Sequence, residues 1–267
     1  MRAGSHSIKG HYMFSLKNRV ALVTGSSRGI GKSIIEQMAN AGAKVVVSSR
    51  KADACEAVRA EFSARGQEAI AVACNVGSKS ELRNLVDTVM ARWGRIDILV
   101  CNAATNPVYG PMASASDEAF DKIMLTNVKS VFWLAGMVLP QMAGRGGGAM
   151  IIVSSIAALR GSSQLGLYAT SKAAEAGMCR ALACEWGPKN IRINCIAPGL
   201  IRTDFARALW EDENRRKARE GLTPLRRIGE PRDIGGIAVF LASEAGSFVT
   251  GQMIVADGGV TIAGERG

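Results

Sequence analysis

The sequence predicts an α/β fold, in which a doubly wound parallel sheet carries helices on both faces. Three observations predict this fold. Short apolar runs alternate with longer segments of helical period, the pattern of repeated strand–helix units. Several of these runs are almost wholly apolar, as strands are when helices cover both faces. A glycine-rich turn, from Gly25 to Gly31, joins the first strand to the first helix.

Four strands and three helices are expected in the first half of the chain. Each strand is a short, mostly apolar run, and each helix follows it with apolar residues three and four apart. The third helix opens with Ser78 and Glu81, which have the spacing of a capping box. The expected strands are 19–24, 44–48, 69–73 and 98–101, and the expected helices run to Asn40, over 52–65 and to about Trp93.

The second half continues the alternation. The glycines between 144 and 148 turn the chain into the next strand, and a proline is suited to the first turn of a helix. The expected elements are a helix at 117–141, a strand at 150–153, a helix from about Tyr168 to Trp186, a strand at 191–197, a helix from Pro231 and a last strand at 252–255.

The charged segment 202–228 interrupts this alternation. It carries apolar side chains at near-helical spacing, Phe205, Leu209 and Trp210. An amphipathic lid that closes its apolar face over a substrate would have this pattern. A surface helix packed on the body would have it too.

Length and composition indicate one soluble domain at 14–267. Residues 1–13 lack the apolar core of a signal peptide and are expected to be a flexible leader or tag. No apolar run approaches eighteen residues, so no membrane span is expected. The six cysteines lack C-x-x-C spacing and suit free thiols in a reducing compartment. We therefore expect a cytoplasmic protein.

The charge and histidine content narrow the class of function. The chain has 33 Lys and Arg against 23 Asp and Glu, a formal charge of +10, which suits a basic surface or a phosphate-bearing ligand. Aromatic residues are only 5% and no DNA-binding signature is present, so nucleic acid is not an expected partner. Both histidines, His6 and His11, lie in the leader. Histidine triads and histidine-rich metal sites are thereby excluded, and no metal is expected.

The glycine-rich turn predicts a dinucleotide site. Glycines between a strand and its helix let a pyrophosphate approach the helix N-terminus, although a turn without a ligand is the alternative. The second strand ends without the carboxylate that binds a free 2′-hydroxyl and offers Arg50 instead. With Arg28 from the turn, Arg50 would bind a 2′-phosphate, unless both are ordinary surface cations. NADP(H) is therefore the preferred cofactor, and NAD(H) is the alternative.

Tyr168 and Lys172 predict an acid–base site. They are four residues apart, so a helix places both on one face. A phenol has a pKa of about 10, and a nearby cation lowers it. A serine hydroxyl at the end of strand 150–153, from Ser154 or Ser155, would complete a site that polarises a carbonyl oxygen. Taken alone, the pair is more often part of a solvated helix face.

In combination, these segments resemble the short-chain dehydrogenase/reductase family, whose members have a Rossmann-type fold. The resemblance covers about 14–261 and is nearest to NADP-dependent carbonyl reductases of the dehydrogenase/reductase member 4 type. It depends on the order and spacing of several motifs. These are Thr24 to Gly31, Asn102-Ala103-Ala104, Asn127, Ser155 thirteen residues before Tyr168, Lys172, and Pro198 to Thr203.

The resemblance implies an activity and a role for each site residue. A hydride would pass between the nicotinamide and a carbonyl carbon, with the proton passing through Tyr168. Ser155 would bind the carbonyl oxygen, and Lys172 would lower the pKa of Tyr168 and bind the nicotinamide ribose. Asn127 would hold a water that links Lys172 to solvent. The cofactor would be bound by Gly25, Ser27, Arg28, Gly29, Ile30, Gly31, Arg50, Asn75, Val76, Asn102, Ala103, Ala104, Tyr168, Lys172, Pro198, Gly199, Ile201 and Thr203.

Two departures from the family pattern affect the expected cofactor site. Asn75 stands where relatives usually have the aspartate that contacts adenine, and an amide keeps an acceptor while adding donors. Ala104 stands in place of a glycine and narrows the freedom of the backbone. Both substitutions therefore bear on the affinity for the cofactor.

Alternative functions remain at this stage. A 3-oxoacyl thioester on an acyl carrier protein or coenzyme A is the main rival to a small carbonyl or alcohol substrate, because basic residues cluster at 215–227. A non-catalytic nucleotide-binding protein is the less favoured reading. The family also implies a homo-tetramer, with which the small-residue faces of 117–141 and 168–186 are compatible. The loop 105–109, the residues after Ser155 and the lid are expected to shape the substrate pocket.

Overall fold

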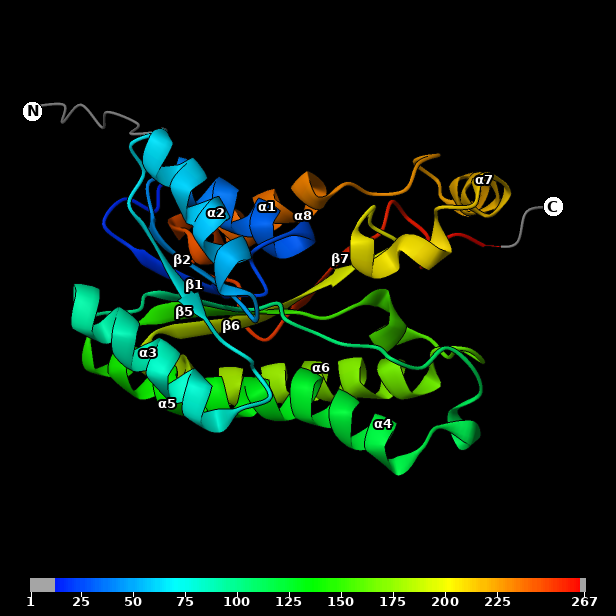
Figure 1. Ribbon diagram of the computed structural model, residues 1–267, viewed down its shortest axis with the longest axis horizontal. Coiled ribbons are helices and arrows are strands. Elements are labelled where there is room, and N and C mark those ends of the chain that lie inside the picture. Colours follow the sequence, from blue (N-terminus) through cyan, green and yellow to red (C-terminus); the bar gives the residue numbers. More distant parts are fainter. Residues whose placement is uncertain (1–12, 265–267) are drawn as a thin grey trace, which may run out of the picture.

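A computed structural model describes residues 13–264 as one parallel sheet with helices on both faces (Figure 1). The seven strands lie in the order β3-β2-β1-β4-β5-β6-β7, and every neighbouring pair is parallel. The predicted doubly wound sheet is confirmed, whereas the predicted leader lies, except for Met13, outside the described residues. The strands are β1 Val20–Thr24, β2 Lys44–Ser49, β3 Ala69–Ala73, β4 Ile98–Cys101, β5 Gly148–Val153, β6 Ile191–Pro198 and β7 Met253–Ala256.

Two helical layers bury the sheet. Helices α1 (Gly29–Asn40), α2 (Ala52–Ala64) and α8 (Pro231–Ala242) cover one face, as Figure 1 shows above the strands. Helices α3 (Lys79–Trp93), α5 (Ser130–Gly144) and α6 (Gly166–Trp186) cover the other. The central strands are buried along their length, since apolar side chains meet a helical layer on both sides. The near-continuous apolar runs of the sequence are thereby explained.

The helix expected at 117–141 is interrupted in the middle. Helix α4 (Asp117–Ile123) passes into a π-helical segment, η2 (Met124–Lys129), before α5 begins. Such segments are rare and often occur at functional sites. This one contains Asn127, which is fully buried. The sequence pattern did not predict it, because a single wide turn hardly disturbs an apolar periodicity.

The same stretch, Asp117–Gly144, is the one helix of the described chain that is long and apolar enough to cross a membrane. Of its most apolar window, 56% is buried inside the fold, as in the core helix of a globular domain. Charged residues such as Lys122 and Lys129 divide its apolar runs, which is why the sequence predicted no span. The absence of a membrane partner stays a prediction.

The predicted capping box of α3 is half formed. The Ser78 hydroxyl accepts a hydrogen bond from the backbone N–H of Glu81 at 3.3 Å. The Glu81 carboxylate, however, accepts from the backbone N–H of Asn75 at 2.8 Å rather than from Ser78. It therefore ties the loop after β3 to the helix, next to a residue of the expected cofactor site.

The segment 202–228 folds as two short helices above the end of the sheet. A 3-10 helix, η5 (Asp204–Leu209), is followed by α7 (Glu213–Leu222). A single bridge between Ile201 and Gly229 closes the segment at its base. Further 3-10 turns are η1 Met112–Ser114, η3 Ile156–Leu159, η4 Gly187–Lys189 and η6 Glu244–Gly246.

Candidate active site

The predicted site residues gather at the carboxyl ends of the central strands. The chain runs outward from β1 through β2 to β3 and then crosses back to β4 on the other side of β1. In open parallel sheets, the crevice for a ligand lies where the strand order reverses in this way. This point lies between the loop after β1 and the loop after β4, and the loops after β5 and β6 come next along the sheet.

The glycine turn has the geometry of a phosphate cradle. Gly25 and Gly29 have φ angles of +67° and +57°, which disfavour other residues. A Cβ on Gly31 would lie 2.3 Å from the carbonyl oxygen of Gly25, so only glycine fits. Arg28 is the N-cap of α1, and its side chain makes no capping hydrogen bond. The helix N-terminus can therefore offer its N–H groups to a pyrophosphate, and the turn fits a dinucleotide.

Two hydrogen bonds of the Ser26 hydroxyl, called here the Ser26 clasp, hold this turn against β2. The Ser26 hydroxyl donates to the carbonyl of Val23 at 2.7 Å and accepts from the backbone N–H of Ser48 at 2.9 Å. The predicted Ser27 and Ile30 lie in the same turn and are half-buried. Sequence analysis did not single out Ser26. Its position between two strand ends becomes evident only once the strands are paired.

Asn102 supports the turn from the end of β4. Its side-chain amide donates to the carbonyl oxygens of Thr24 at 2.9 Å and Gly25 at 3.1 Å. The backbone N–H of Ala103 donates to the Thr24 hydroxyl at 3.2 Å. Ala104 is not among the described non-glycine residues with positive φ, so replacing the usual glycine causes no backbone strain at this position. That departure from the family pattern leaves the local backbone unstrained.

The two predicted phosphate-binding arginines lie in different surroundings. Arg50 is exposed, and its guanidinium makes no ion pair or side-chain hydrogen bond within residues 13–264. Arg28 is also exposed, but it lies 3.5 Å from the Asp204 carboxylate at the start of the lid helix η5. Arg50 is therefore free to take a 2′-phosphate, whereas Arg28 already has a partner in the lid.

Asn75 retains part of its hydrogen-bonding capacity. Its side-chain oxygen accepts from the backbone N–H of Gly77 at 3.1 Å, which forms a local turn. No hydrogen bond is present on its amide nitrogen within the described chain, which leaves two donors for a ligand. Val76 beside it is buried. The amide that replaces the usual aspartate is thus held in place by Gly77.

The residues after β6 bring the lid to the glycine turn. Pro198 ends the strand, and a Cβ on Gly199 would lie 2.8 Å from the Cα atom of Asp257. Ile201 is buried, and the Thr203 hydroxyl caps η5 by accepting from Ala206. A Cβ on Gly29 would lie 3.3 Å from the Thr203 methyl group. Residues far apart in sequence therefore meet around the expected cofactor path.

Tyr168 and Lys172 lie on one face of α6, as predicted. The Lys172 Nζ lies 5.6 Å from the centroid of the Tyr168 ring. Ser155 precedes the turn η3, where its hydroxyl accepts from the N–H of Ala157 at 3.1 Å. Ser154 takes a different role, since its buried hydroxyl donates to the carbonyl of Lys172 at 3.0 Å. Of the two serines, Ser155 is the one whose hydroxyl lowers the pKa of Tyr168 by hydrogen bonding.

The pKa of Tyr168 reflects opposing influences. Burial raises it above its usual value, while the Lys172 charge and a Ser155 hydrogen bond lower it in part. Glu175, a residue that sequence analysis did not consider, raises it further. Lys172 therefore acts on the Tyr168 pKa in the predicted direction, and burial outweighs its effect.

Asn127 is held by protein contacts on every side. Its oxygen accepts from the backbone N–H of Thr105 at 2.8 Å, and its nitrogen donates to the carbonyl of Thr105 at 3.1 Å and the hydroxyl of Ser171 at 3.0 Å. Both side-chain donors are used. A water at Asn127 would have to bind its oxygen or the backbone of the π-helical segment.

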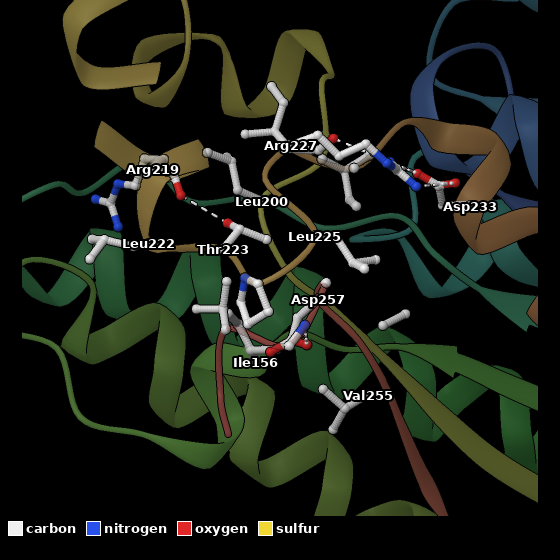
Figure 2. A pocket seen from close by; sticks show the side chains of 18 of the residues that line it. Ile156, Leu200, Arg219, Leu222, Thr223, Leu225, Arg227, Asp233, Val255 and Asp257 are labelled. Carbon is white, nitrogen blue, oxygen red and sulfur yellow. Dashed lines mark hydrogen bonds and ion pairs between the residues drawn. The ribbon is translucent and has the colours of Figure 1, made fainter. Parts of the chain in front are cut away.

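A cavity of about 570 Å³ lies next to the catalytic face, between the lid and the end of β7 (Figure 2). Its wall includes Ile156, which directly follows Ser155, and it is largely apolar. Part of the polar wall is paired, since the Arg227 guanidinium binds the Asp233 carboxylate. Residues after Ser155 and from the lid line this cavity, whereas the loop 105–109, Ser155 and Tyr168 do not. Its apolar residues include Ile156, Leu200, Leu222, Leu225 and Val255.

Part of the lid lies directly over the catalytic face. The Phe205 ring in η5 lies 6.3 Å from the Tyr168 ring, centroid to centroid, at 44°. Phe205 is nevertheless 58% exposed. Within the described residues, Phe205 is thus the aromatic side chain of this segment that packs against the Tyr168 ring.

In the described residues, no group of three or more His, Cys, Asp or Glu side chains could hold a metal ion.

Comparison with known proteins adds the family. A family model described as Enoyl-(Acyl carrier protein) reductase matches residues 25–261. Dehydrogenase/reductase SDR family member 4 of Homo sapiens is 43% identical over 244 residues, which cover 91% of this chain and 88% of that protein. The Mus musculus protein of the same name is 41% identical over 244 residues, with the same coverage of each chain.

Solved structures agree with this match. A 7α-hydroxysteroid dehydrogenase in complex with NADH and 7-oxo glycochenodeoxycholic acid superimposes with a TM-score of 0.89 at 38% identity, covering 92% of this chain and 96% of that one. A gluconate 5-dehydrogenase from Burkholderia cenocepacia J2315, in complex with NADP and tartrate, gives a TM-score of 0.90 at 31% identity. It covers 96% of this chain and 100% of that one.

Proposed function

The chain belongs to the short-chain dehydrogenase/reductase family, and we propose that this NAD(P)-dependent oxidoreductase is a carbonyl reductase that prefers NADP(H). It interconverts a carbonyl and an alcohol. The observation that carries the proposal is that Lys172 lies on the same face of α6 as Tyr168, with its Nζ 5.6 Å from the centre of the Tyr168 ring, while Ser155 at the end of β5 influences the Tyr168 hydroxyl. The glycine turn after β1, in which a Cβ at Gly31 would clash with the backbone, supports a bound dinucleotide.

The proposed chemistry divides between cofactor and protein. When bound, the nicotinamide supplies or accepts the hydride. Ser155 and the Tyr168 hydroxyl hydrogen-bond the carbonyl oxygen as negative charge develops on it, and Tyr168 delivers the proton. Lys172 stabilises the phenolate that remains. Asn127 keeps the π-helical segment in place beside Ser171 and so supports a proton path to solvent.

The preference for NADP(H) is supported by charge at the end of β2. Arg50 is exposed without a partner in the described chain, and no carboxylate stands at this strand end to bind a free 2′-hydroxyl. A guanidinium makes strong charge-assisted hydrogen bonds to phosphate. Among the solved relatives, one is in complex with NADP and another with NADH, so the family admits both cofactors.

The proposed substrate class rests on the cavity that Ile156, the residue after Ser155, helps to line. Its apolar wall favours a ketone or aldehyde with a hydrophobic body. A 3-oxoacyl thioester is the second candidate, because α7 is basic and its residues Arg219 and Leu222 line this cavity. Within α7, Lys217 and Arg216 are paired with Glu213 and Glu220, which leaves Arg215 and Arg219 for an acidic carrier. Turnover of a carrier-bound substrate that falls steeply with added salt would favour this candidate.

Assembly and location are part of the proposal. We propose a homo-tetramer formed through the faces of α4, α5 and α6. Large aromatic side chains are exposed on two of these helices, with Phe120 at 45% and Phe132 at 63%. A cytoplasmic location suits the unpaired thiols, five of which are buried.

The test is a fluorescence titration with NADPH and NADH, followed by turnover on a panel of ketones and aldehydes. NADPH-selective binding with turnover of a carbonyl is the expected result. Equal affinity for both cofactors would contradict the proposed NADP(H) preference. Binding of neither cofactor would contradict the proposed function as a whole.

A further inference from the structure

A buried carboxylate, Glu175, lies one helical turn beyond Lys172 on α6. The side chains of both residues are only 2% exposed. The Lys172 Nζ lies 2.8 Å from one Glu175 carboxylate oxygen and 3.2 Å from the other. A buried charge pair of this geometry ties the two side chains closely together.

This pair leaves part of the hydrogen-bonding capacity of Lys172 unused. An ammonium group has three donors. One points to the carbonyl oxygen of Val153 at 3.0 Å, and a second is shared by the two adjacent oxygens of the Glu175 carboxylate. Within the described residues the third donor has no partner, so Glu175 can hold the ammonium in place without blocking a ribose hydroxyl.

Glu175 also acts on the charge at Tyr168. The Lys172 cation lowers the pKa of the phenol, and the Glu175 carboxylate raises it. Burial raises the pKa of Glu175 itself to about 7, while Lys172 opposes that rise. Besides Lys172 and Tyr168, the titratable groups that face this carboxylate are the thiols of Cys101 on β4 and Cys195 on β6. Both thiols are protonated at neutral pH, because burial raises the pKa of Cys101, and a hydrogen bond with Cys179 together with burial raises that of Cys195.

We propose that Glu175 is a positioning residue that fixes the Lys172 ammonium below Tyr168 and cancels part of its positive charge there. The carboxylate limits how strongly Lys172 stabilises the phenolate. It thereby sets the pH at which Tyr168 gives up its proton. The inference deepens the proposed function and rests on it only for the kinetic measurement.

A purely structural role for Glu175 makes a different prediction. If the carboxylate only filled space in the core, replacing it would change stability but not the titration of Tyr168. Gln has nearly the same shape as Glu and no charge, and Asp keeps the charge but withdraws it from Lys172. Glu185 is an exposed glutamate on the same helix, so Glu185→Gln is the matched control.

The first experiment measures the Tyr168 phenolate by ultraviolet difference absorbance in the protein without cofactor. The chain has three tyrosines, so each variant is compared with the same variant carrying Tyr168→Phe. We expect Glu175→Gln to lower the midpoint by roughly one pH unit, the lower end of the effect of a nearby charge. Glu175→Asp should lower it by less, and Glu185→Gln should not change it.

Two results would overturn the inference. The first is a phenolate midpoint in Glu175→Gln that equals that of the wild type. The second is a midpoint that shifts equally in the Gln and Asp variants, since such a shift would come from altered packing of the side chain and not from its charge. If circular dichroism shows that Glu175→Gln does not fold, the phenolate midpoint of Glu175→Asp alone tests the inference. A midpoint below that of the wild type supports the inference, and an unchanged or higher one refutes it.

The second experiment follows alcohol oxidation, in which Tyr168 must be deprotonated. The rise of kcat/KM with pH should move to lower pH in Glu175→Gln by the same amount as the phenolate midpoint. An unmoved profile in an active variant contradicts the inference. A wild-type protein without any nicotinamide-dependent turnover defeats the proposed function instead, and the phenolate titration then still decides the role of Glu175.

Discussion

The catalytic half and the phosphate-binding half of the candidate site differ in whether their side chains already have partners in the protein. At the catalytic half, Lys172 and Asn127 are buried, and most of their side-chain donors are engaged by other parts of the protein. At the phosphate half, Arg50 is exposed without a partner in the described chain, and the α1 N-terminus has no side-chain cap. The protein itself fixes the geometry for proton transfer. Recognition of the cofactor, by contrast, depends on groups that have no protein partner in the described chain.

This difference predicts which properties of the protein a substitution in each half should change. Changes in the catalytic half should alter the rate, the pH dependence and the stability together, because each side chain is part of a buried network. Changes in the phosphate half should alter the affinity and the choice of cofactor, with little effect on stability. Four predictions test this division, from the largest expected effect to the smallest.

Replacing Tyr168 with Phe should have the largest effect. The ring and its packing remain, but the proton donor is lost, so kcat should fall by about 10²–10⁴-fold, the usual contribution of general acid–base catalysis. NADPH affinity, measured by fluorescence titration, should be nearly unchanged. Turnover equal to that of the wild type would remove Tyr168 from the mechanism.

Replacing Lys172 with Met should break the buried pair. The Glu175 carboxylate would lose its partner, which costs about 3–5 kcal/mol of unfolding free energy for a buried pair. Denaturant unfolding at alkaline pH measures this loss, since ionising a lone buried carboxyl is costly there. The double variant Lys172→Met/Glu175→Leu should recover most of it.

Lys189→Met serves as the control for an exposed lysine and should change the free energy of unfolding by no more than about 0.5 kcal/mol. If the double variant is no more stable than Lys172→Met, the two buried side chains do not act as a pair.

Replacing Arg50 with Asp should change the cofactor preference. Loss of a charged hydrogen bond costs about 1.5–3 kcal/mol, so NADPH affinity should fall about ten- to a hundredfold. NADH affinity should change much less, and the melting temperature should stay the same. Arg83→Asp, at an exposed position of α3 on the other face of the sheet, is the control. Equal losses for both cofactors would remove Arg50 from the 2′-phosphate role.

The smallest expected effect is on stability as a function of pH. Burial raises the pKa of Glu175 to about 7 from an ordinary value of 4.5. An acid whose pKa is raised in the folded state stabilises the fold fully below its unfolded pKa and loses that contribution as the pH rises through the folded pKa. The free energy of unfolding should therefore fall between about pH 4.5 and 7 in part because of Glu175. Glu175→Gln should flatten the curve in that window, and an unchanged slope would contradict the assignment.

Sequence analysis predicted the parts of the site that depend on local spacing. Tyr168 and Lys172 share a face because a helix places residues four apart together, and the glycines of the first turn follow from strand–helix geometry. The alternation of apolar runs likewise predicted the parallel sheet. These features need only neighbours along the chain.

The features that were missed depend on burial or on distant partners. Glu175 is three residues from Lys172, but nothing in the sequence indicates that both are buried and bonded. The Ser26 clasp requires β2 to lie beside β1, and the pairing of Arg28 requires the lid to fold back over the glycine turn. The π-helical segment around Asn127 is fixed by contacts with Thr105 and Ser171. Such contacts are determined by the fold as a whole.

The most direct test of the central claim is the transfer of a labelled hydride. The purified protein would be given NADPH that carries deuterium at its transferable position, together with a ketone that it turns over, and the alcohol would be analysed by mass spectrometry. The account predicts one deuterium on the carbinol carbon with the wild type and almost no alcohol with Tyr168→Phe. Alcohol without deuterium at that carbon, or equal product from Tyr168→Phe, would contradict it.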